Sequence, residues 1–161
     1  MNEQTQQIMF SSKSDMWATP QKLFDSLNQT YNFTLDPCAT AQSAKCSKFY
    51  TEEDDGLSKD WAGEVVFVNP PYSEVGKWVE KCYNEYRQND VISVLLVPAR
   101  TDTKWFHKYC LYADIIQFVK GRVKFENGDP KPNSAPFPSM IVVFDPRLMN
   151  EPPILTGYSM G

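Results

Sequence analysis

The stretch Val65-Val66-Phe67-Val68-Asn69-Pro70-Pro71-Tyr72 carries the strongest indication of the fold. Its first four residues form a continuous apolar run, mostly β-branched, of the kind found in strands that are buried on both faces. Asn69 and the two prolines end the run, because proline has no backbone N–H to donate to a neighbouring strand. The stretch therefore predicts a buried parallel strand followed by a rigid turn at 69–72, which we call the NPPY turn.

Segments on both sides of this strand alternate between strand and helix patterns. Apolar residues at helical spacing predict a helix over 75–88. Thr19-Pro20 predicts another helix start, with a hydroxyl cap followed by proline. Further apolar or extended runs lie at 33–36, 48–50, 91–97, 115–119, 122–125 and 140–144, with another helical pattern at 103–112. This alternation predicts an α/β fold with a mostly parallel sheet and helices on both faces.

The length of 161 residues fits one folded domain. We expect this domain to span 15–145, after a flexible polar lead-in at 1–14 and before a tail at 146–161. No stretch approaches the ~18 apolar residues of a membrane span, and the first residues lack the apolar core of a signal peptide. We therefore expect a cytoplasmic protein with no membrane partner.

The cysteine and histidine content argues against a metal site. The four cysteines form no closely spaced pair, and His107 is the only histidine. We expect four free thiols in a reducing compartment and no bound metal. The cysteines are Cys38, Cys46, Cys82 and Cys110.

Charge is unevenly distributed along the chain. The whole sequence has a net charge of −4, whereas residues 97–133 hold seven basic and four acidic side chains. The overall acidity argues against a general nucleic-acid coat protein, but a local basic segment permits a phosphate-binding face. On charge alone, a solvated lysine-bearing surface explains the segment equally well.

The NPPY turn has the composition needed to act on an amine attached to a flat ring. Such an amine is a poor nucleophile, because its lone pair is delocalised into the ring. The Asn69 side-chain oxygen and the Pro70 carbonyl are two acceptors that can draw the nitrogen toward tetrahedral geometry, and Pro71 helps to hold them in place. Tyr72 supplies a face for stacking. The alternative is a proline-rich turn with a purely structural role.

Together with the NPPY turn, several blocks of the chain resemble the small phage and prophage type of adenine-N6 DNA methyltransferase. These blocks are Trp17-Ala18-Thr19-Pro20, Leu35-Asp36-Pro37-Cys38-Ala39, Asp55-Gly56-Leu57, Leu96-Val97-Pro98-Ala99-Arg100-Thr101 and Gly121-Arg122-Val123-Lys124-Phe125. The resemblance runs from about residue 15 to residue 145. It implies a Rossmann-like methyltransferase sheet, S-adenosylmethionine as cofactor, and methyl transfer to the N6 amine of a flipped-out adenine in double-stranded DNA. The catalytic residues it implies are Asn69, Pro70, Pro71 and Tyr72.

The resemblance also implies a cofactor site. Its residues would be Trp17, Thr19, Pro20, Asp36, Cys38, Ala39, Asp54, Asp55 and Asn69. Either Asp54 or Asp55 would meet hydroxyl or amine donors of the cofactor, since an ionised carboxylate only accepts hydrogen bonds. Two simpler roles remain open, with Asp36 capping a helix over 38–45 and Thr19 serving only as a helix cap. The segment 36–40 also lacks the glycine-rich turn that most such enzymes carry.

For the DNA, the resemblance implies contacts from the basic part of the chain. Arg100, Arg122 and Lys124 are the candidate DNA-binding residues, within a candidate DNA-contacting region at 100–139. It further implies a phage- or prophage-encoded protein in the cytoplasm of a bacterial host. We expect a monomer or a weak dimer.

Two kinds of alternative function remain open. The same turn would suit methyl transfer to another planar amine, such as RNA adenine, cytosine N4 or a protein glutamine. A non-catalytic DNA-binding module belongs to a different class, although such a module has no need of two acceptors directed at an amine. Aromatic residues such as Trp78, Tyr83 and Tyr86 could stack on bases. Their helical spacing instead predicts that they are buried in the core.

Overall fold

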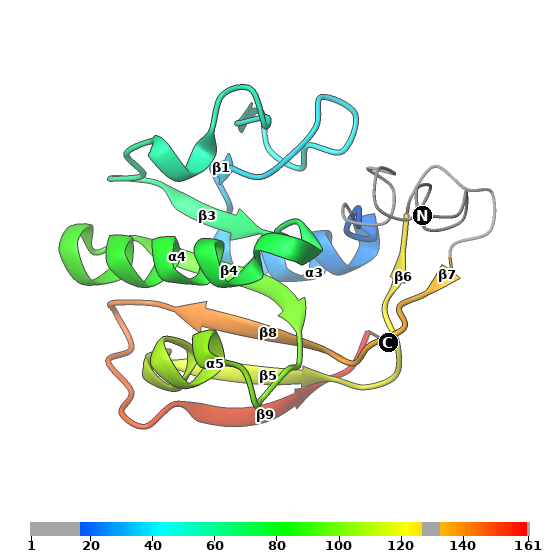
Figure 1. Cartoon of the computed structure of the whole chain (residues 1–161), viewed down its shortest axis with the longest axis vertical. Coiled ribbons are helices and arrows are strands. Elements are labelled where there is room, and N and C mark those ends of the chain that lie inside the picture. Colours follow the sequence, from blue (N-terminus) through cyan, green and yellow to red (C-terminus); the bar gives the residue numbers. More distant parts are fainter. Residues whose placement is uncertain (1–16, 127–132, 161) are drawn as a thin grey trace, which may run out of the picture.

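The computed structural model describes residues 17–126 and 133–160. Its centre is a seven-stranded sheet in the order β2-β1-β3-β4-β8-β5-β9 (Figure 1). The strands are β1 (Leu35–Asp36), β2 (Lys48–Phe49), β3 (Val65–Val68), β4 (Ile92–Pro98), β5 (Ile115–Val119), β8 (Ser139–Phe144) and β9 (Ile154–Tyr158). Within the described residues, four of the six neighbouring pairs are parallel, and β8 runs antiparallel to both β4 and β5. The sheet is therefore mixed but mostly parallel.

Helices cover both faces of the sheet, as the alternating pattern predicts. The α-helices are α3 (Gln21–Tyr31), α4 (Val75–Asn89) and α5 (Lys104–Lys108), and the 3-10 helices are η1 (Gly56–Ser58), η2 (Tyr72–Glu74) and η3 (Cys110–Tyr112). In Figure 1, α4 and α5 lie in front of the sheet and α3 lies behind it. The helix expected over 75–88 is confirmed, whereas the one expected over 103–112 is divided into α5 and η3.

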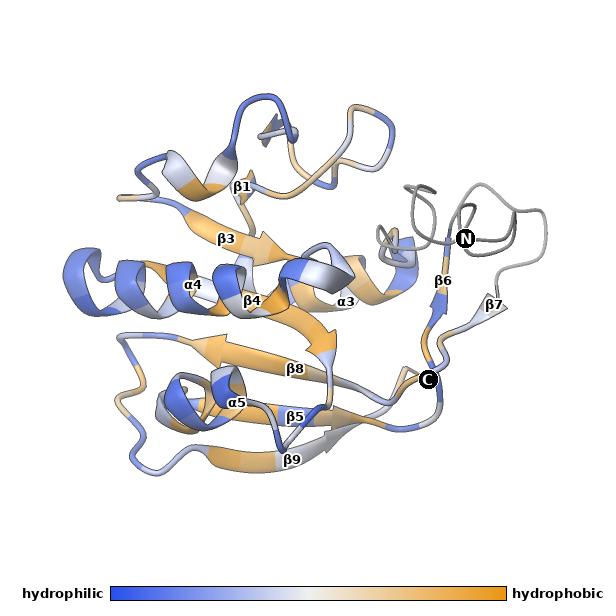
Figure 2. Ribbon diagram, in the orientation of Figure 1, coloured by the Kyte–Doolittle hydropathy of each residue, from blue (hydrophilic) through white to orange (hydrophobic). Residues whose placement is uncertain are grey.

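Two apolar cores explain this layering. In β3, Val66 and Val68 pack in the core that contains Val79 of α4, whereas Phe67 packs in the core that contains Phe24 of α3. Successive strand residues thus point to opposite faces, as strand geometry requires. Figure 2 shows the hydrophobic colour concentrated in the central strands. The continuous apolar run at 65–68 is therefore a strand buried on both faces, which confirms the α/β prediction.

The aromatic residues of α4 belong to the core, as their spacing predicts. Trp78 is 5% exposed, and Tyr83 and Tyr86 are partly buried against the same core. All four cysteines are free, with Cys82 and Cys110 buried and the other two half-buried. Burial raises the pKa of the Cys110 thiol to about 12, which keeps this buried thiol protonated near neutral pH.

The structure corrects the expectation of a tail at 146–161. Residues 154–158 form β9, which pairs in parallel with β5 along its whole length. The side chains of Ile154 and Leu155 are 49% and 61% exposed, so this strand is held by its backbone pairing and leaves no buried apolar pattern in the sequence. The lead-in expected at 1–14 lies outside the described residues.

A small hairpin stands beyond the ends of the parallel strands. It consists of β6 (Lys124–Phe125) and β7 (Asn133–Ser134), which pair antiparallel. In Figure 1 this hairpin lies at the side where β3 and β4 end and where α3 begins. This edge therefore collects the NPPY turn, the start of α3 and the hairpin. No helix in the described part of the chain is both long and apolar enough to cross a membrane.

Candidate active site at the carboxyl edge of the sheet

The NPPY turn leaves β3 at the carboxyl edge, and its first residue is held by a distant part of the chain. The amide nitrogen of Asn69 donates hydrogen bonds to the backbone carbonyl of Trp17 and to the hydroxyl of Thr19, the latter at 3.0 Å. A carbonyl only accepts hydrogen bonds, so the nitrogen of the amide must face Trp17. The side-chain oxygen of Asn69 therefore remains as the atom that can accept from a ligand.

Thr19 has a role different from the expected helix cap. Pro20 occupies the N-cap position of α3, and no side chain caps this helix. Thr19 is 3% exposed, and its hydroxyl accepts from Asn69 instead. The cap expectation was wrong because the helix begins one residue later than the Thr-Pro pattern predicts.

An aromatic cluster lies beside Asn69. It consists of Trp17, Tyr72, Phe125 and Phe137, which come from four separate segments. Phe137 contacts the other three, with its ring centroid 4.8 Å from that of Tyr72. It is also 6% exposed. The sequence analysis missed Phe137, and the available signal was an aromatic residue within the proline-rich segment before the strand at 140–144.

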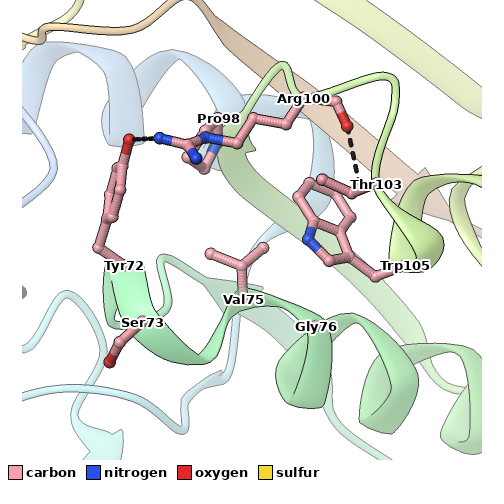
Figure 3. Close-up of a pocket in the computed structure, with 8 residues that line it drawn as sticks. All are labelled: Tyr72, Ser73, Val75, Gly76, Pro98, Arg100, Thr103 and Trp105. Atoms are coloured by element: carbon pink, nitrogen blue, oxygen red, sulfur yellow. Dashed lines mark hydrogen bonds between the residues drawn. The ribbon is translucent and has the colours of Figure 1, made fainter.

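Arg100 reaches the NPPY turn from the end of β4. Its guanidinium carbon lies 4.8 Å from the ring centroid of Tyr72, and its Nη2 donates a hydrogen bond to the tyrosine hydroxyl. Arg100 is exposed. The structure thus joins a predicted DNA-binding residue to a predicted catalytic one (Figure 3).

On the other side of the NPPY turn, Asp36 ends β1 as a buried carboxylate. It is 4% exposed, and its Oδ2 accepts from the backbone N–H of Lys45 at 3.0 Å. Burial raises the pKa of Asp36 to about 6, against the opposing effect of backbone hydrogen bonds from Lys45 and Cys38. The alternative role as a helix cap was wrong, because residues 38–45 form no helix and contain only a turn at 41–43.

The loop that follows β2, residues 50–56, is acidic and packs against the segment that follows Asp36. The backbone N–H of Ala39 donates to the carbonyl of Tyr50 at 3.0 Å. Gly56 lies so close to this segment that a Cβ there would overlap the carbonyl oxygen of Pro37. The structure therefore brings together two of the segments from which the cofactor residues are predicted.

The two acidic candidates of this loop differ in their surroundings. Asp54 is exposed, and its carboxylate accepts from the backbone N–H and the hydroxyl of Thr51 at 2.9 and 3.1 Å. These hydrogen bonds hold the pKa of Asp54 below its usual value. Asp55 is exposed and adopts a left-handed backbone conformation with φ of 55°. That either Asp54 or Asp55 contacts a cofactor stays a prediction.

The remaining DNA-binding candidates lie on the hairpin side. Arg122 and Lys124 are both exposed. Arg122 donates from Nη1 to the carbonyl of Ala135 at 3.5 Å, across the base of the hairpin. Within the described residues, no hydrogen bond or ion pair joins either side chain to the NPPY turn. Part of the expected DNA-contacting region, 127–132, lies outside the described residues.

No group of three or more histidine, cysteine, aspartate or glutamate side chains that could hold a metal ion occurs in the described ranges 17–126 and 133–160. The NPPY turn and the residues around it carry amide, carbonyl, carboxylate and aromatic groups. These are acceptors and stacking surfaces rather than a nucleophile with a base.

The α/β sheet, with Asn69 and an aromatic cluster at its carboxyl edge, is compatible with the class of amino-methyltransferases. The family model described as DNA N-6-adenine-methyltransferase (Dam) matches residues 6–159. The chain belongs to this family and is an adenine-specific DNA methyltransferase. The resemblance seen in the sequence blocks is confirmed.

Individual relatives agree with this assignment. The chain is 31% identical over 141 residues to the DNA N-6-adenine-methyltransferase of Haemophilus phage HP1 (strain HP1c1). The aligned region covers 84% of this chain and 82% of the relative. It is 35% identical over 94 residues to the enzyme of the same name from Escherichia phage T1, covering 57% and 39% of the two chains. It is 37% identical over 65 residues to the putative methyltransferase YfdM of Escherichia coli (strain K12), covering 36% and 71%.

Proposed function

We propose that this chain transfers the methyl group of S-adenosylmethionine to the N6 amine of an adenine flipped out of duplex DNA, on a Rossmann-like methyltransferase fold. The observation that carries the proposal is the fixed orientation of Asn69. Its amide nitrogen is engaged by Trp17 and Thr19, so its oxygen remains as an acceptor. The Pro70 carbonyl, next in the chain, is proposed as the second acceptor. Membership of the adenine-N6 family supplies the substrate.

The first step is the capture of the extruded base. A target inside a duplex is out of reach, so the enzyme takes it out of the stack at a cost of a few kcal/mol. Tyr72 offers a face for stacking, which stabilises a bound base by about 1–3 kcal/mol. Phe137, 4.8 Å from Tyr72 between ring centroids, completes an apolar wall next to Asn69.

The second step is the activation of the amine. The Asn69 oxygen and the Pro70 carbonyl each accept one hydrogen of the N6 amine, which draws the nitrogen lone pair out of conjugation with the ring. The cofactor supplies an electrophilic methyl group. At the N6 nitrogen this methyl group would replace one hydrogen, whose proton would leave to solvent. An amide accepts no proton near neutral pH, so Asn69 positions and polarises the amine and does not act as a base.

The residues proposed to bind the cofactor fit its donor groups. Asp36 and the loop with Asp54 and Asp55 offer carboxylates that accept from hydroxyls and amines. The hydroxyl of Thr19 accepts from Asn69, so its own hydrogen is left for an acceptor such as a cofactor carboxylate. The other proposed contacts are Trp17, Pro20, Cys38 and Ala39.

DNA binding is proposed for Arg100, Arg122 and Lys124. All three are exposed, and they lie near the end of β4 and on the hairpin beyond the carboxyl edge. Arginine suits phosphate because its fork of donors binds two oxygens at once. We further propose that the protein acts in the cytoplasm of a bacterial host, which its relatives from two phages support. A monomer or weak dimer is proposed from the sequence alone.

The test is methyl transfer from labelled S-adenosylmethionine to unmethylated duplex DNA, followed by mass spectrometry of the released nucleosides. We expect N6-methyladenine, with competition by unlabelled DNA and none by RNA or by a glutamine-containing peptide. N4-methylcytosine, or label in RNA or peptide, would replace this proposal with methyl transfer to another planar amine. Binding of DNA without any transfer would favour the non-catalytic module.

A further inference from the structure

A pocket of about 190 Å³ opens on the other side of Tyr72 (Figure 3). It lies between the start of α4 and the segment that joins β4 to α5. Its lining residues are Tyr72, Ser73, Val75, Gly76, Pro98, Arg100, Thr103 and Trp105. Of these, Tyr72 and Arg100 belong to the site described above, and the others have no role in it.

This pocket is distinct from the place proposed for the target base. Asn69 does not line it, and of the aromatic cluster only Tyr72 does. Val75 and Trp105 belong to the core on the α4 side, whereas Tyr72 packs against the core on the α3 side. Tyr72 therefore lies between the aromatic cluster and this pocket.

The shape of the pocket suits a flat ring. Figure 3 shows Tyr72 and Trp105 on opposite sides of it, with Val75 between them. Aromatic side chains on two sides and an aliphatic side chain between them favour a planar ligand through aromatic and apolar contact. Gly76 allows Trp105 to approach α4 closely, because a Cβ at this position would lie 3.3 Å from its Cδ1.

The charge at the rim suits an anion. Arg100 reaches across the rim to Tyr72, and no carboxylate lines the pocket. A guanidinium carries five donors, so Arg100 can bind a phosphate as well as the tyrosine hydroxyl. The hydroxyl of Thr103 is used in local structure, because it donates to the carbonyl of Arg100 at 2.8 Å and accepts from Phe106 as the cap of α5. The segment that carries Arg100 is thereby fixed.

A ligand with one flat ring and one phosphate is a nucleotide. We propose that this pocket binds the base of a nucleotide adjacent to the target adenine, with Trp105 as its stacking partner and Arg100 on its phosphate. The inference rests on the proposed function, since it needs a DNA substrate whose target base lies at Tyr72. It makes Trp105 a substrate-binding residue that couples the flanking nucleotide to the catalytic turn.

The test is a double-mutant cycle between Trp105 and the flanking base. Duplexes with one methylatable adenine carry an abasic site at either neighbouring position, and each is compared with the intact duplex. Wild type and Trp105→Leu are compared on every duplex by kcat/KM and by equilibrium DNA binding. At one neighbouring position, we expect Trp105→Leu and the abasic site each to lower kcat/KM by roughly 5- to 150-fold, and the two together to lower it no further.

Controls separate this effect from misfolding and from the cofactor. Trp105→Phe keeps an aromatic face and should restore most of the rate, and Glu80→Gln, at an exposed position of α4 outside the candidate DNA-contacting region, should leave it unchanged. The affinity of Trp105→Leu for S-adenosylmethionine should stay within about twofold of wild type. Loss of this affinity for S-adenosylmethionine would overturn the proposal, because it would assign the pocket to the cofactor.

The double-mutant cycle measured by DNA binding tests the pocket even if no methyl group is transferred. Failure of the proposed function can therefore be distinguished from failure of this inference. Independent effects of Trp105→Leu and of both abasic positions would overturn the inference while leaving the proposed function intact. Absence of DNA binding by the wild type would overturn both.

Discussion

The amide nitrogen of Asn69 donates a hydrogen bond to the hydroxyl of Thr19, 3.0 Å away and 50 residues earlier in the chain. A second hydrogen bond joins the same nitrogen to the backbone carbonyl of Trp17. The segment before α3 therefore sets the orientation of the Asn69 amide. This relationship makes Thr19 a positioning residue for the proposed reaction, in addition to any contact with the cofactor.

Removing the hydroxyl of Thr19 should reduce turnover more than stability. Thr19→Val keeps the shape of the side chain but loses a hydrogen bond that contributes about 0.5–1.5 kcal/mol. We expect kcat to fall about tenfold at saturating cofactor, and Thr19→Ser to restore most of it. The readout is the single-turnover methylation rate, with Thr156→Val on the exposed edge strand as the matched control. Equal rates for Thr19→Val and wild type would show that Asn69 needs no support from Thr19.

Phe137 should matter for both folding and substrate binding. Truncation of a buried phenylalanine to alanine costs about 3–5 kcal/mol of stability, so Phe137→Ala should unfold at a clearly lower temperature. Phe137→Leu should cost less than about 1.5 kcal/mol but remove the ring beside Tyr72. We expect this variant to fold and to lose about tenfold in kcat/KM for DNA. Phe118→Leu, a substitution at an exposed strand position, should change neither value.

Cofactor affinity should depend on pH through Asp36. Its pKa is about 6, raised from an ordinary value of 3.8, so the carboxylate is ionised above pH 6 and becomes protonated below it. Only the ionised form accepts from two or more cofactor donors, so binding should weaken about tenfold for each pH unit below 6. Calorimetry between pH 4.5 and 8 would reveal the profile. Asp54 cannot produce it, because hydrogen bonds from Thr51 hold its pKa below the usual value.

The control for this profile is Asp36→Asn, which should bind the cofactor weakly and with no pH dependence between 5 and 7. An unchanged profile in this variant would assign the titration to another group. A flat profile in the wild type would remove Asp36 from the cofactor site.

The close approach at Gly56 should be intolerant of any side chain. In Gly56→Ala the new Cβ would overlap the Pro37 carbonyl, so one of the two loops must move. We expect a loss of about 1–3 kcal/mol in stability and weaker cofactor binding. The matched control is Gly157→Ala, whose Cβ would lie 4.0 Å from its nearest neighbour. Gly56→Ala with wild-type affinity would show that the packing of these loops does not shape the cofactor site.

The sequence predicted those parts of the fold that depend on periodic burial. The strand at 65–68 and the helix at 75–89 are both recognisable because their apolar residues recur at the spacing of the element. The strand at 154–158 was missed, because its side chains are mostly exposed and its place in the sheet depends on backbone pairing with 115–119. Backbone pairing leaves no mark on side-chain composition.

The candidate site divides in the same way. The NPPY turn is contiguous in sequence, so its residues could be identified together. Phe137 and Trp105 could not be assigned a place, since the tertiary structure alone brings them to opposite sides of Tyr72. The contact of Arg100 with Tyr72 is likewise invisible in the sequence, because the two residues are 28 positions apart.

The central claim is that Asn69 and the Pro70 carbonyl act on the target amine during transfer. The most direct measurement is the single-turnover rate of N6-methyladenine formation by wild type and Asn69→Ala, with saturating S-adenosylmethionine and duplex DNA. Loss of one acceptor that acts in the transition state should lower this rate by about 10²- to 10³-fold, while DNA binding stays within a few-fold of wild type. A rate for Asn69→Ala within about threefold of wild type would contradict the account.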